Sequence, residues 1–201
     1  MFTGIIEEVG EVVEARVGLL RLRVSRIQDG TKLGDSISVD GVDLTVAEIK
    51  GTELSFNVMA ETYRATTLGR LGTRSRVNLE RAMRAEDRFS GHVVRGVVEG
   101  TGLIEAWCND GDSLIMTCAA PGHLIQSMIE RGPVCVDGVS LTVIAKTDLT
   151  FSVSLVAFTQ AHTTLPERRI GDPVNIETDI MMRYVSQALR VRGLLPVEQQ
   201  S

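Results

Sequence analysis

The sequence predicts a mostly β protein built from two similar small barrels in tandem, followed by an α-helix. Three observations predict this fold. One pattern of residues occurs twice, short runs of alternating apolar and polar residues are separated by glycine turns, and an amphipathic stretch lies outside both copies. Alternation is typical of strands with one buried face, and closing a sheet into a barrel removes its exposed edges.

The repeat divides the chain. SVDGVDLTV begins at position 38 and returns as CVDGVSLTV at position 135, 97 residues later. At the same offset VNLE returns as VNIE and MAETYRATTL as VAFTQAHTTL, while TGIIEEVG is echoed by RGVVEGTG at an offset of 92. Matches in the same order indicate two copies of a unit of about 95 residues. We therefore expect one barrel over residues 1–88, a second over 89–178, and a helix and tail over 179–201.

The first copy contains runs with the composition and turn punctuation of strands. They cover residues 19–24, 36–42, 43–49, 53–59 and 75–80. The Asp-Gly pair at positions 40 and 41, near the end of the second run, predicts a tight turn. Beyond that turn the apolar residues at 42, 44 and 46 share the face expected to point into the barrel. Asp43 and Thr45 share the opposite face, as Ser140 and Thr142 do in the second copy.

Two stretches have helical rather than strand spacing. PGHLIQSMIERG, residues 121–132, predicts a helix that ends at Gly132. TDIMMRYVSQALRV, residues 178–191, places Met181, Val185 and Ala188 on one face and begins with a capping Thr-Asp pair. Because this helix belongs to neither repeat, its apolar stripe predicts a docking or oligomerisation element.

Composition narrows the class of protein. The net charge of −5 gives no basic surface for nucleic acid or an anionic membrane. No stretch reaches the ~20 apolar residues of a membrane span, and the N-terminus lacks the pattern of a signal peptide. Cys108, Cys118 and Cys135 are predicted to be reduced thiols of a cytoplasmic protein, and with the three histidines they form no pair at metal-ligand spacing.

MFTGII, DGVxLTV twice, MAET with TTLG, SGHVVRGVVEGTG and VNLE/VNIE together resemble the riboflavin synthase family of lumazine-binding proteins over residues 1–190. The resemblance implies two six-stranded barrels and a C-terminal helix through which three chains form a homotrimer. It also implies that each ligand site lies between the N-terminal barrel of one subunit and the C-terminal barrel of its neighbour.

The same resemblance implies a transferase of flavin biosynthesis that needs no metal and no bound cofactor. Family enzymes transfer a four-carbon unit between two molecules of 6,7-dimethyl-8-ribityllumazine, which yields riboflavin and a diaminopyrimidine. The 7-methyl group of one molecule is deprotonated and C7 of the other is attacked. Holding the two rings antiparallel is mainly a task of proximity and orientation.

Site residues carried over from the family fall into two half-sites of three walls each. The N-terminal half-site is expected to use Gly4, Ile5 and Ile6, then Asp43, Leu44 and Thr45, then Met59, Ala60, Glu61 and Thr62. The C-terminal half-site is expected to use Gly96, Val97 and Val98, then Ser140, Leu141 and Thr142, then Val156, Ala157, Phe158 and Thr159, with Arg131 at a position that is often basic. Backbone groups and threonine hydroxyls suit a pteridine edge and a ribityl chain.

The chain departs from the family pattern at three places. Asp43 stands where the family has Cys, Val97 stands where it has His, and Val156-Ala157 replaces Ile-Pro. A carboxylate cannot act as a thiol nucleophile but can act as a base. If Asp43 lies near Glu61, their like charges would raise the pKa of one of them toward neutrality. Asp43, Ser140 and Glu61 are therefore the candidate catalytic residues.

Three functions remain open at this point. The first is a riboflavin synthase. The second is a related cyclisation or addition on another conjugated heterocycle, as in secondary metabolism, with Asp43 as acid or base. The third is a non-catalytic protein that binds a lumazine or a flavin. Fold alone does not choose among them.

Overall fold

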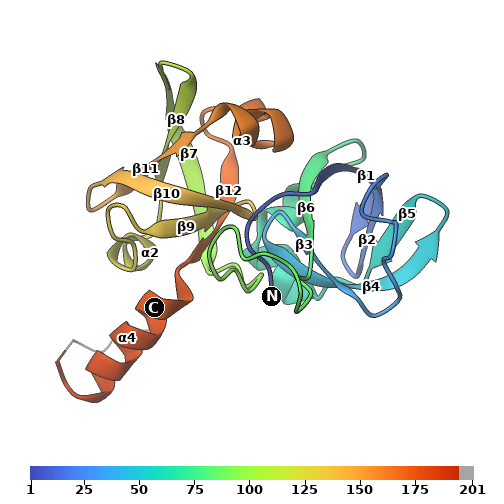
Figure 1. Ribbon diagram of the computed structural model, residues 1–201, viewed down its shortest axis with the longest axis horizontal. Coiled ribbons are helices and arrows are strands. Elements are labelled where there is room, and N and C mark those ends of the chain that lie inside the picture. The colour runs from blue at the N-terminus through green and yellow to red at the C-terminus, as the bar shows by residue number, and fades with distance from the viewer. Residues whose placement is uncertain (195–201) are drawn as a thin grey trace.

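A computed structural model describes residues 1–194, in which two closed antiparallel barrels of six strands each lie side by side (Figure 1). The first barrel has the strand order β1-β2-β5-β4-β3-β6. Its strands are β1 (Glu8–Arg16), β2 (Leu19–Arg23), β3 (Ser36–Val39), β4 (Val42–Lys50), β5 (Glu53–Phe56) and β6 (Arg76–Arg81). The prediction of two similar barrels is confirmed.

The second barrel has the strand order β10-β11-β8-β7-β12-β9. Its strands are β7 (Gly100–Asp110), β8 (Ser113–Ala119), β9 (Pro133–Val136), β10 (Val139–Lys146), β11 (Thr150–Leu155) and β12 (Pro173–Thr178). The helices are α1 (Ala60–Ala65), α2 (Gly122–Gln126), α3 (Ala157–His162) and α4 (Ile180–Val191), with short 3-10 turns η1 (Thr67–Arg70) and η2 (Leu165–Glu167).

The expected parity of the repeated strand is confirmed. On β4 the apolar residues at 42, 44 and 46 are buried, whereas Asp43 and Thr45 are exposed. On β10 the apolar residues at 139, 141 and 143 are buried, Ser140 is half-buried and Thr142 is exposed. The octapeptide therefore places one polar pair on the outside of each barrel.

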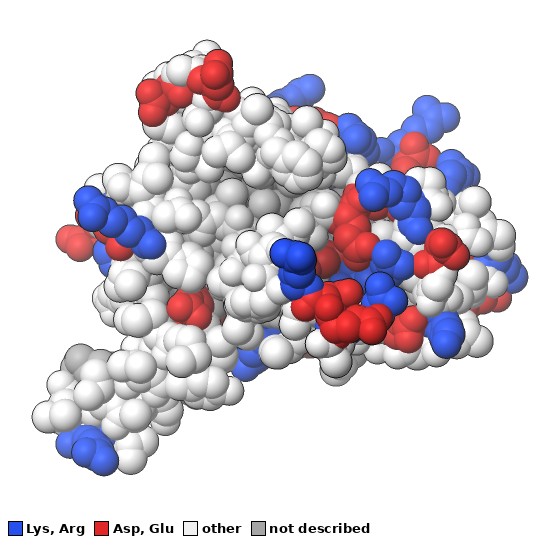
Figure 2. All heavy atoms as spheres, viewed as in Figure 1, with Lys and Arg blue, Asp and Glu red and all other residues white. Residues whose placement is uncertain are grey.

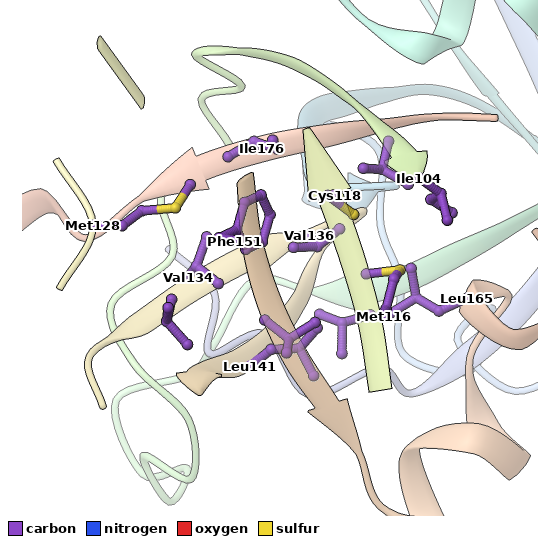
Figure 3. Close-up of a cluster of buried hydrophobic side chains, with 14 of the residues drawn as sticks. Ile104, Met116, Cys118, Met128, Val134, Val136, Leu141, Phe151, Leu165 and Ile176 are labelled. Atoms are coloured by element: carbon purple, nitrogen blue, oxygen red, sulfur yellow. The ribbon is translucent and has the colours of Figure 1, made fainter. Parts of the chain in front are cut away.

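Each barrel encloses its own apolar core, and Figure 3 shows side chains from several strands of the second barrel, Phe151 among them, in that core. The segments that precede the barrels do not pack where their position in the chain suggests. Ile6, ahead of the first barrel, belongs to the core of the second. Val98, ahead of the second barrel, packs against the core of the first. The two N-terminal segments therefore cross between the barrels.

The Asp-Gly turns of the two copies meet at the junction between the barrels. Asp40 and Asp137 have φ values of 45° and 44°, followed by Gly41 and Gly138 at 83° and 81°, as in the tight hairpin turns expected. A Cβ on Gly41 would lie 2.9 Å from the backbone nitrogen of Gly138, so only glycine fits.

Polar side chains then join the two barrels across this junction. Asn78 donates to the carbonyl oxygen of Asp137 at 2.9 Å, and Asn175 donates to that of Asp40 at 2.8 Å. Arg168 contacts the carboxylates of Asp40 and Asp137 at 3.3 and 3.0 Å. Burial and the charge of Asp137 raise the pKa of Asp40 to about 8, against the opposing effect of Arg168.

The helix predicted over residues 121–132 is much shorter in the structure. It ends at Gln126, after which the chain turns inward and buries Met128. Lys146 donates to the carbonyl oxygens of Ile125 and Met128 at 2.8 and 2.7 Å, which satisfies backbone groups that a longer helix would have used. A side chain distant in sequence therefore replaces the expected stop at Gly132.

The C-terminal helix is confirmed as predicted. Asp179 caps it by accepting from the backbone nitrogen of Met181 at 3.0 Å. Figure 1 shows α4 projecting away from the second barrel, and its predicted apolar face is exposed, with Met181 61% and Val185 51% accessible. Within residues 1–194 no helix is long and apolar enough to cross a bilayer.

Candidate active site

Two short segments, residues 2–6 and residues 94–98, cross between the barrels and pair with each other. Phe2 donates to the carbonyl oxygen of Val94 at 2.8 Å, and Val94 donates to that of Phe2 at 3.1 Å. Each segment then continues into a glycine with positive φ, 77° at Gly4 and 80° at Gly96. These glycines lie directly against the repeated strands. The crossing therefore determines which segment lies beside each candidate site.

The first segment runs to the second barrel. The carbonyl oxygen of Gly4 accepts the backbone N–H of Ser140 at 2.8 Å. A Cβ at position 4 would lie 2.6 Å from the Cβ of Ser140, so a side chain there would push the segment away. Ile5 follows and is 41% exposed. Together with Thr142, these residues form what we call the Ser140 site.

The second segment makes the equivalent contact with the first barrel. The carbonyl oxygen of Gly96 accepts the backbone N–H of Asp43 at 2.9 Å, and a Cβ on Gly96 would lie 2.6 Å from that of Asp43. Val97 follows and is 43% exposed. With Thr45, these residues form what we call the Asp43 site.

This arrangement corrects the expected grouping of the walls. The wall that begins at Gly4 was expected beside Asp43, and the wall that begins at Gly96 was expected beside Ser140. The structure exchanges them, because each segment crosses to the other barrel before it reaches its glycine. Each site therefore combines a strand of one barrel with a segment that leads into the other barrel.

A histidine that the sequence reasoning did not place in the site completes the Ser140 site. His92 Nδ1 lies 2.7 Å from Ser140 Oγ, and the backbone N–H of His92 donates to the carbonyl oxygen of Thr3 at 3.2 Å. Its Nε2 is buried and has no hydrogen-bond partner among residues 1–194. The neighbouring Gly91 allows this packing, since a Cβ there would lie 1.9 Å from the oxygen of Thr3.

The chemistry of this pair follows from its surroundings. Burial lowers the pKa of His92 below its usual 6.5, and the negative charge of Asp179 opposes the shift only in part. The imidazole is therefore neutral at pH 7, where it can accept a proton from, or through, the hydroxyl of Ser140. A neutral imidazole next to a hydroxyl is a suitable acid–base pair.

The Asp43 site holds a carboxylate instead. Asp43 is exposed beside Gly96, and Val97 supplies an apolar side chain where an imidazole would offer a second proton carrier. Glu61 lies on α1, where its carboxylate pairs with Arg64 at 2.8 Å. The two sites therefore share a backbone plan but differ in their polar groups.

The third walls lie at the corresponding ends of the strands. On β4 and β5 Val46 lies opposite Phe56, so the antiparallel register leads α1 to begin at the Asp43 end of β4. On β10 and β11 Val143 lies opposite Val153, which brings the start of α3 to the Ser140 end of β10. Both starts are largely open to solvent: Met59, Ala60, Glu61, Val156, Ala157 and Phe158 are exposed, and Thr62 and Thr159 are half-buried.

Three predicted wall residues turn their side chains away from the surface. Ile6, Leu44 and Leu141 are 9%, 6% and 6% exposed and belong to the barrel cores, which leaves only their backbone atoms for a ligand. Val98 is half-buried. Arg131 is exposed at φ 65° in the turn before β9, with its backbone N–H on the carbonyl oxygen of Val143 at 2.8 Å.

Two surface grooves flank the crossing segments. One of about 780 Å³ is lined by Thr3, Ile5 and Glu80, and one of about 540 Å³ is lined by Arg95, Val97 and residues of α4. Neither of these grooves, both built from described residues, is lined by Asp43 or Ser140. On the face in Figure 2 charged groups gather over the first barrel, whereas the second barrel and α4 are largely uncharged.

Comparisons with known proteins show the family to which the chain belongs. The family model described as the lumazine binding domain matches residues 3–82 and again residues 95–179. The chain is 40% identical over 201 residues to the riboflavin synthase of Mycobacterium bovis, covering 96% of this chain and 100% of that protein. It is 39% identical over 193 residues to the riboflavin synthase of Actinobacillus pleuropneumoniae, covering 94% and 90% of the two chains.

A solved structure shares the fold at lower identity. The crystal structure of LumP complexed with riboflavin superposes with a TM-score of 0.82 and 22% sequence identity, covering 89% of this chain and 99% of that chain. LumP complexed with 6,7-dimethyl-8-(1'-D-ribityl) lumazine gives a TM-score of 0.79 at 21% identity and the same coverage.

Proposed function

Because the chain belongs to the lumazine binding domain family, we propose that it is a riboflavin synthase-type transferase. Its substrate is a lumazine-type heterocycle, and it joins two molecules of 6,7-dimethyl-8-ribityllumazine to give riboflavin and a diaminopyrimidine. The relatives named riboflavin synthase, matched over nearly their whole length, support this proposal. In this proposal the first barrel domain spans residues 1–88 and the second spans residues 89–178.

The observation that carries the proposal is the pairing of His92 with Ser140 beside a glycine wall. The reaction needs a base that removes a proton from the 7-methyl group of one lumazine. The neutral His92 imidazole, acting through the Ser140 hydroxyl, suits that step. The resulting carbanion attacks C7 of the second lumazine, and the same proton carriers return protons as the four-carbon unit leaves its first ring. No oxidant is needed, since two identical molecules give one larger and one smaller product.

The second lumazine is assigned to the Asp43 site. The carboxylate of Asp43 lies at the glycine wall of that site, where it can accept or return a proton at the attacked ring. Glu61 is the second carboxylate of this site in the proposal. Its ion pair with Arg64 favours a role in orienting the ligand over one in proton transfer.

The complete site is proposed to form between two subunits of a homotrimer. Ile5, Met59, Val97, Val156 and Phe158 are apolar and between 41% and 74% exposed in a single chain, which suits walls that another subunit covers. The exposed apolar face of α4 supplies a contact between chains. The free thiols of the three cysteines suit the cytoplasm. Removing the chain after Thr178 should give smaller assemblies in sedimentation, whereas an unaltered trimer would contradict the role of α4.

A second candidate function rests on the Asp43 site. A carboxylate beside Val97 gives that site an acid or base and no imidazole, which suits a related addition or cyclisation on another conjugated heterocycle. A protein that only binds its lumazine or flavin is the remaining alternative. Both alternatives are compatible with the crossed glycine walls, and in neither of them is lumazine converted to riboflavin.

Incubation of the purified protein with 6,7-dimethyl-8-ribityllumazine, followed by riboflavin absorbance, tests the proposal. We expect riboflavin to form with catalytic amounts of protein. Quenching or a shift of lumazine fluorescence without riboflavin would favour the binding protein. No change in fluorescence and no riboflavin would favour another heterocycle as substrate.

A further inference from the structure

We propose that Glu80 and Glu177 are reciprocal positioning residues, in which the carboxylate carried by each barrel holds the backbone wall of the other barrel's site. The inference deepens the proposed function, since it assigns residues to the two sites described above. It concerns positioning alone, because within residues 1–194 both carboxylates hydrogen-bond to the crossing segments and not to Asp43 or Ser140.

Glu80, on β6 of the first barrel, binds the first crossing segment. Its Oε1 accepts from the backbone nitrogen and from the hydroxyl of Thr3, both at 2.7 Å, and its Oε2 accepts from the backbone nitrogen of Gly4 at 2.9 Å. The same Gly4 then accepts from the N–H of Ser140 in the second barrel. One continuous path of hydrogen bonds therefore runs from Glu80 to the Ser140 site.

Glu177, on β12 of the second barrel, makes the equivalent path in the opposite direction. Its Oε1 accepts from the backbone nitrogen of Arg95 at 2.7 Å, and its Oε2 accepts from those of Gly96 and Val97 at 2.9 Å each. Gly96 then accepts from the N–H of Asp43 in the first barrel. The two crossing segments pair with each other at Phe2 and Val94, next to both paths.

The register of the sheets shows that the crossing is built into the repeat. In the first barrel Glu80 lies opposite Ser38, which in turn lies opposite Asp43. Glu80 and Asp43 therefore lie at the same level of the first barrel, on either side of Ser38. The segment that Glu80 binds nevertheless contacts Ser140, in the second barrel. Glu177 and Ser140 lie at the corresponding level of the second barrel, on either side of Cys135, yet the segment that Glu177 binds contacts Asp43.

Burial makes these carboxylates depend on the protein groups that donate to them. Glu80 is 4% and Glu177 is 3% exposed. The pKa of both residues is raised, because the effect of burial outweighs that of the hydrogen bonds, which lower it. A buried carboxylate is tolerated only when its oxygens are hydrogen-bonded, so each side chain fixes the segment that supplies the donors.

Glu80→Gln and Glu177→Gln form a matched pair of tests that needs no substrate. Each replacement keeps the size of the side chain and removes one acceptor oxygen. Amide hydrogen exchange by NMR should show the Ser140 N–H exchanging about tenfold faster in Glu80→Gln, with the Asp43 N–H changed by less than about twofold. In Glu177→Gln the pattern should reverse. Equal acceleration of both amides, or acceleration at the wrong site, would overturn the proposal.

Glu8→Gln is the control, because Glu8 also binds backbone nitrogens, those of Ser25, Arg26 and Ile27, within the first barrel. It should alter neither the Ser140 nor the Asp43 amide. The exchange result stands even if the unaltered protein fails to convert lumazine, which would refute the proposed function alone. If the unaltered protein converts lumazine, we expect Glu80→Gln to lower kcat while the midpoint of urea denaturation stays unchanged. An unchanged midpoint would show that the lower kcat does not come from unfolding.

Discussion

The Nδ1 atom of His92 lies 2.7 Å from the hydroxyl oxygen of Ser140, although 48 residues separate them in the sequence. His92 lies in the connection between the barrels and Ser140 in a strand of the second barrel. The first crossing segment joins them, since His92 donates its backbone N–H to Thr3 and Ser140 donates its own to Gly4. This pair gives the Ser140 site an imidazole, whereas the Asp43 site has a carboxylate beside Val97.

Replacing either partner should reduce turnover without preventing binding. We expect Ser140→Ala and His92→Gln each to lower kcat for riboflavin formation by about 10²–10³-fold, in the range typical of general acid–base groups. Because the two act as a unit, the double variant should be little worse than either single one. Ser152→Ala, in β11 of the same barrel, is the control and should leave kcat unchanged. Multiplicative losses would show that the two residues act separately.

The pH dependence of the reaction should reflect the lowered pKa of His92. The buried imidazole stays neutral down to values below 6.5, so kcat should hold from pH 7 to 6.5 and fall only at lower pH. Stability follows the same direction, because the unfolded chain takes up a proton at 6.5 that the folded chain refuses, and the free energy of unfolding declines below that pH. His92→Gln should remove the acidic limb from the residual activity. An acidic limb above pH 6.5 would contradict this environment.

Asp43→Asn tests the carboxylate of the other site. The amide keeps the size of the side chain and the backbone bond to Gly96 but cannot accept a proton as a base. We expect a loss of more than about tenfold in kcat with lumazine affinity within about twofold, measured by fluorescence titration. An unchanged kcat would contradict a role for Asp43 in proton transfer and would show that it is a solvated carboxylate at the edge of the site.

The junction between the barrels should weaken as the pH rises from 3.8 to about 8. Because the pKa of Asp40 is raised to about 8, the folded chain holds a proton that the unfolded chain, with a pKa near 3.8, releases. This contribution to the free energy of unfolding is therefore fully present below pH 3.8, declines as the pH rises toward 8 and is gone above it. Asp40→Asn should reduce the loss of stability between pH 5 and 9 by on the order of 1–3 kcal/mol, measured by urea denaturation. The exposed Asp110→Asn is the control and should retain the full loss.

Much of the fold could be predicted because a repeat and a two-residue period leave direct traces in sequence. The barrels, the Asp-Gly turns and the outward-facing Asp43 and Ser140 follow from such traces. The crossing could not be predicted, since the position of Gly4 before the first barrel says nothing about which barrel its segment reaches. His92 was missed as a site residue because it has no counterpart in the first copy, and α1 and α3 were missed because six residues are too short for a helical period to appear.

The central claim, that this chain joins two lumazine molecules, is tested most directly by stoichiometry. Purified protein is mixed with excess 6,7-dimethyl-8-ribityllumazine, and both lumazine and riboflavin are quantified by chromatography over many turnovers. We predict that two lumazine molecules disappear for each riboflavin formed, with one diaminopyrimidine as the second product. Lumazine that stays intact in the presence of folded protein, bound or free, would contradict it.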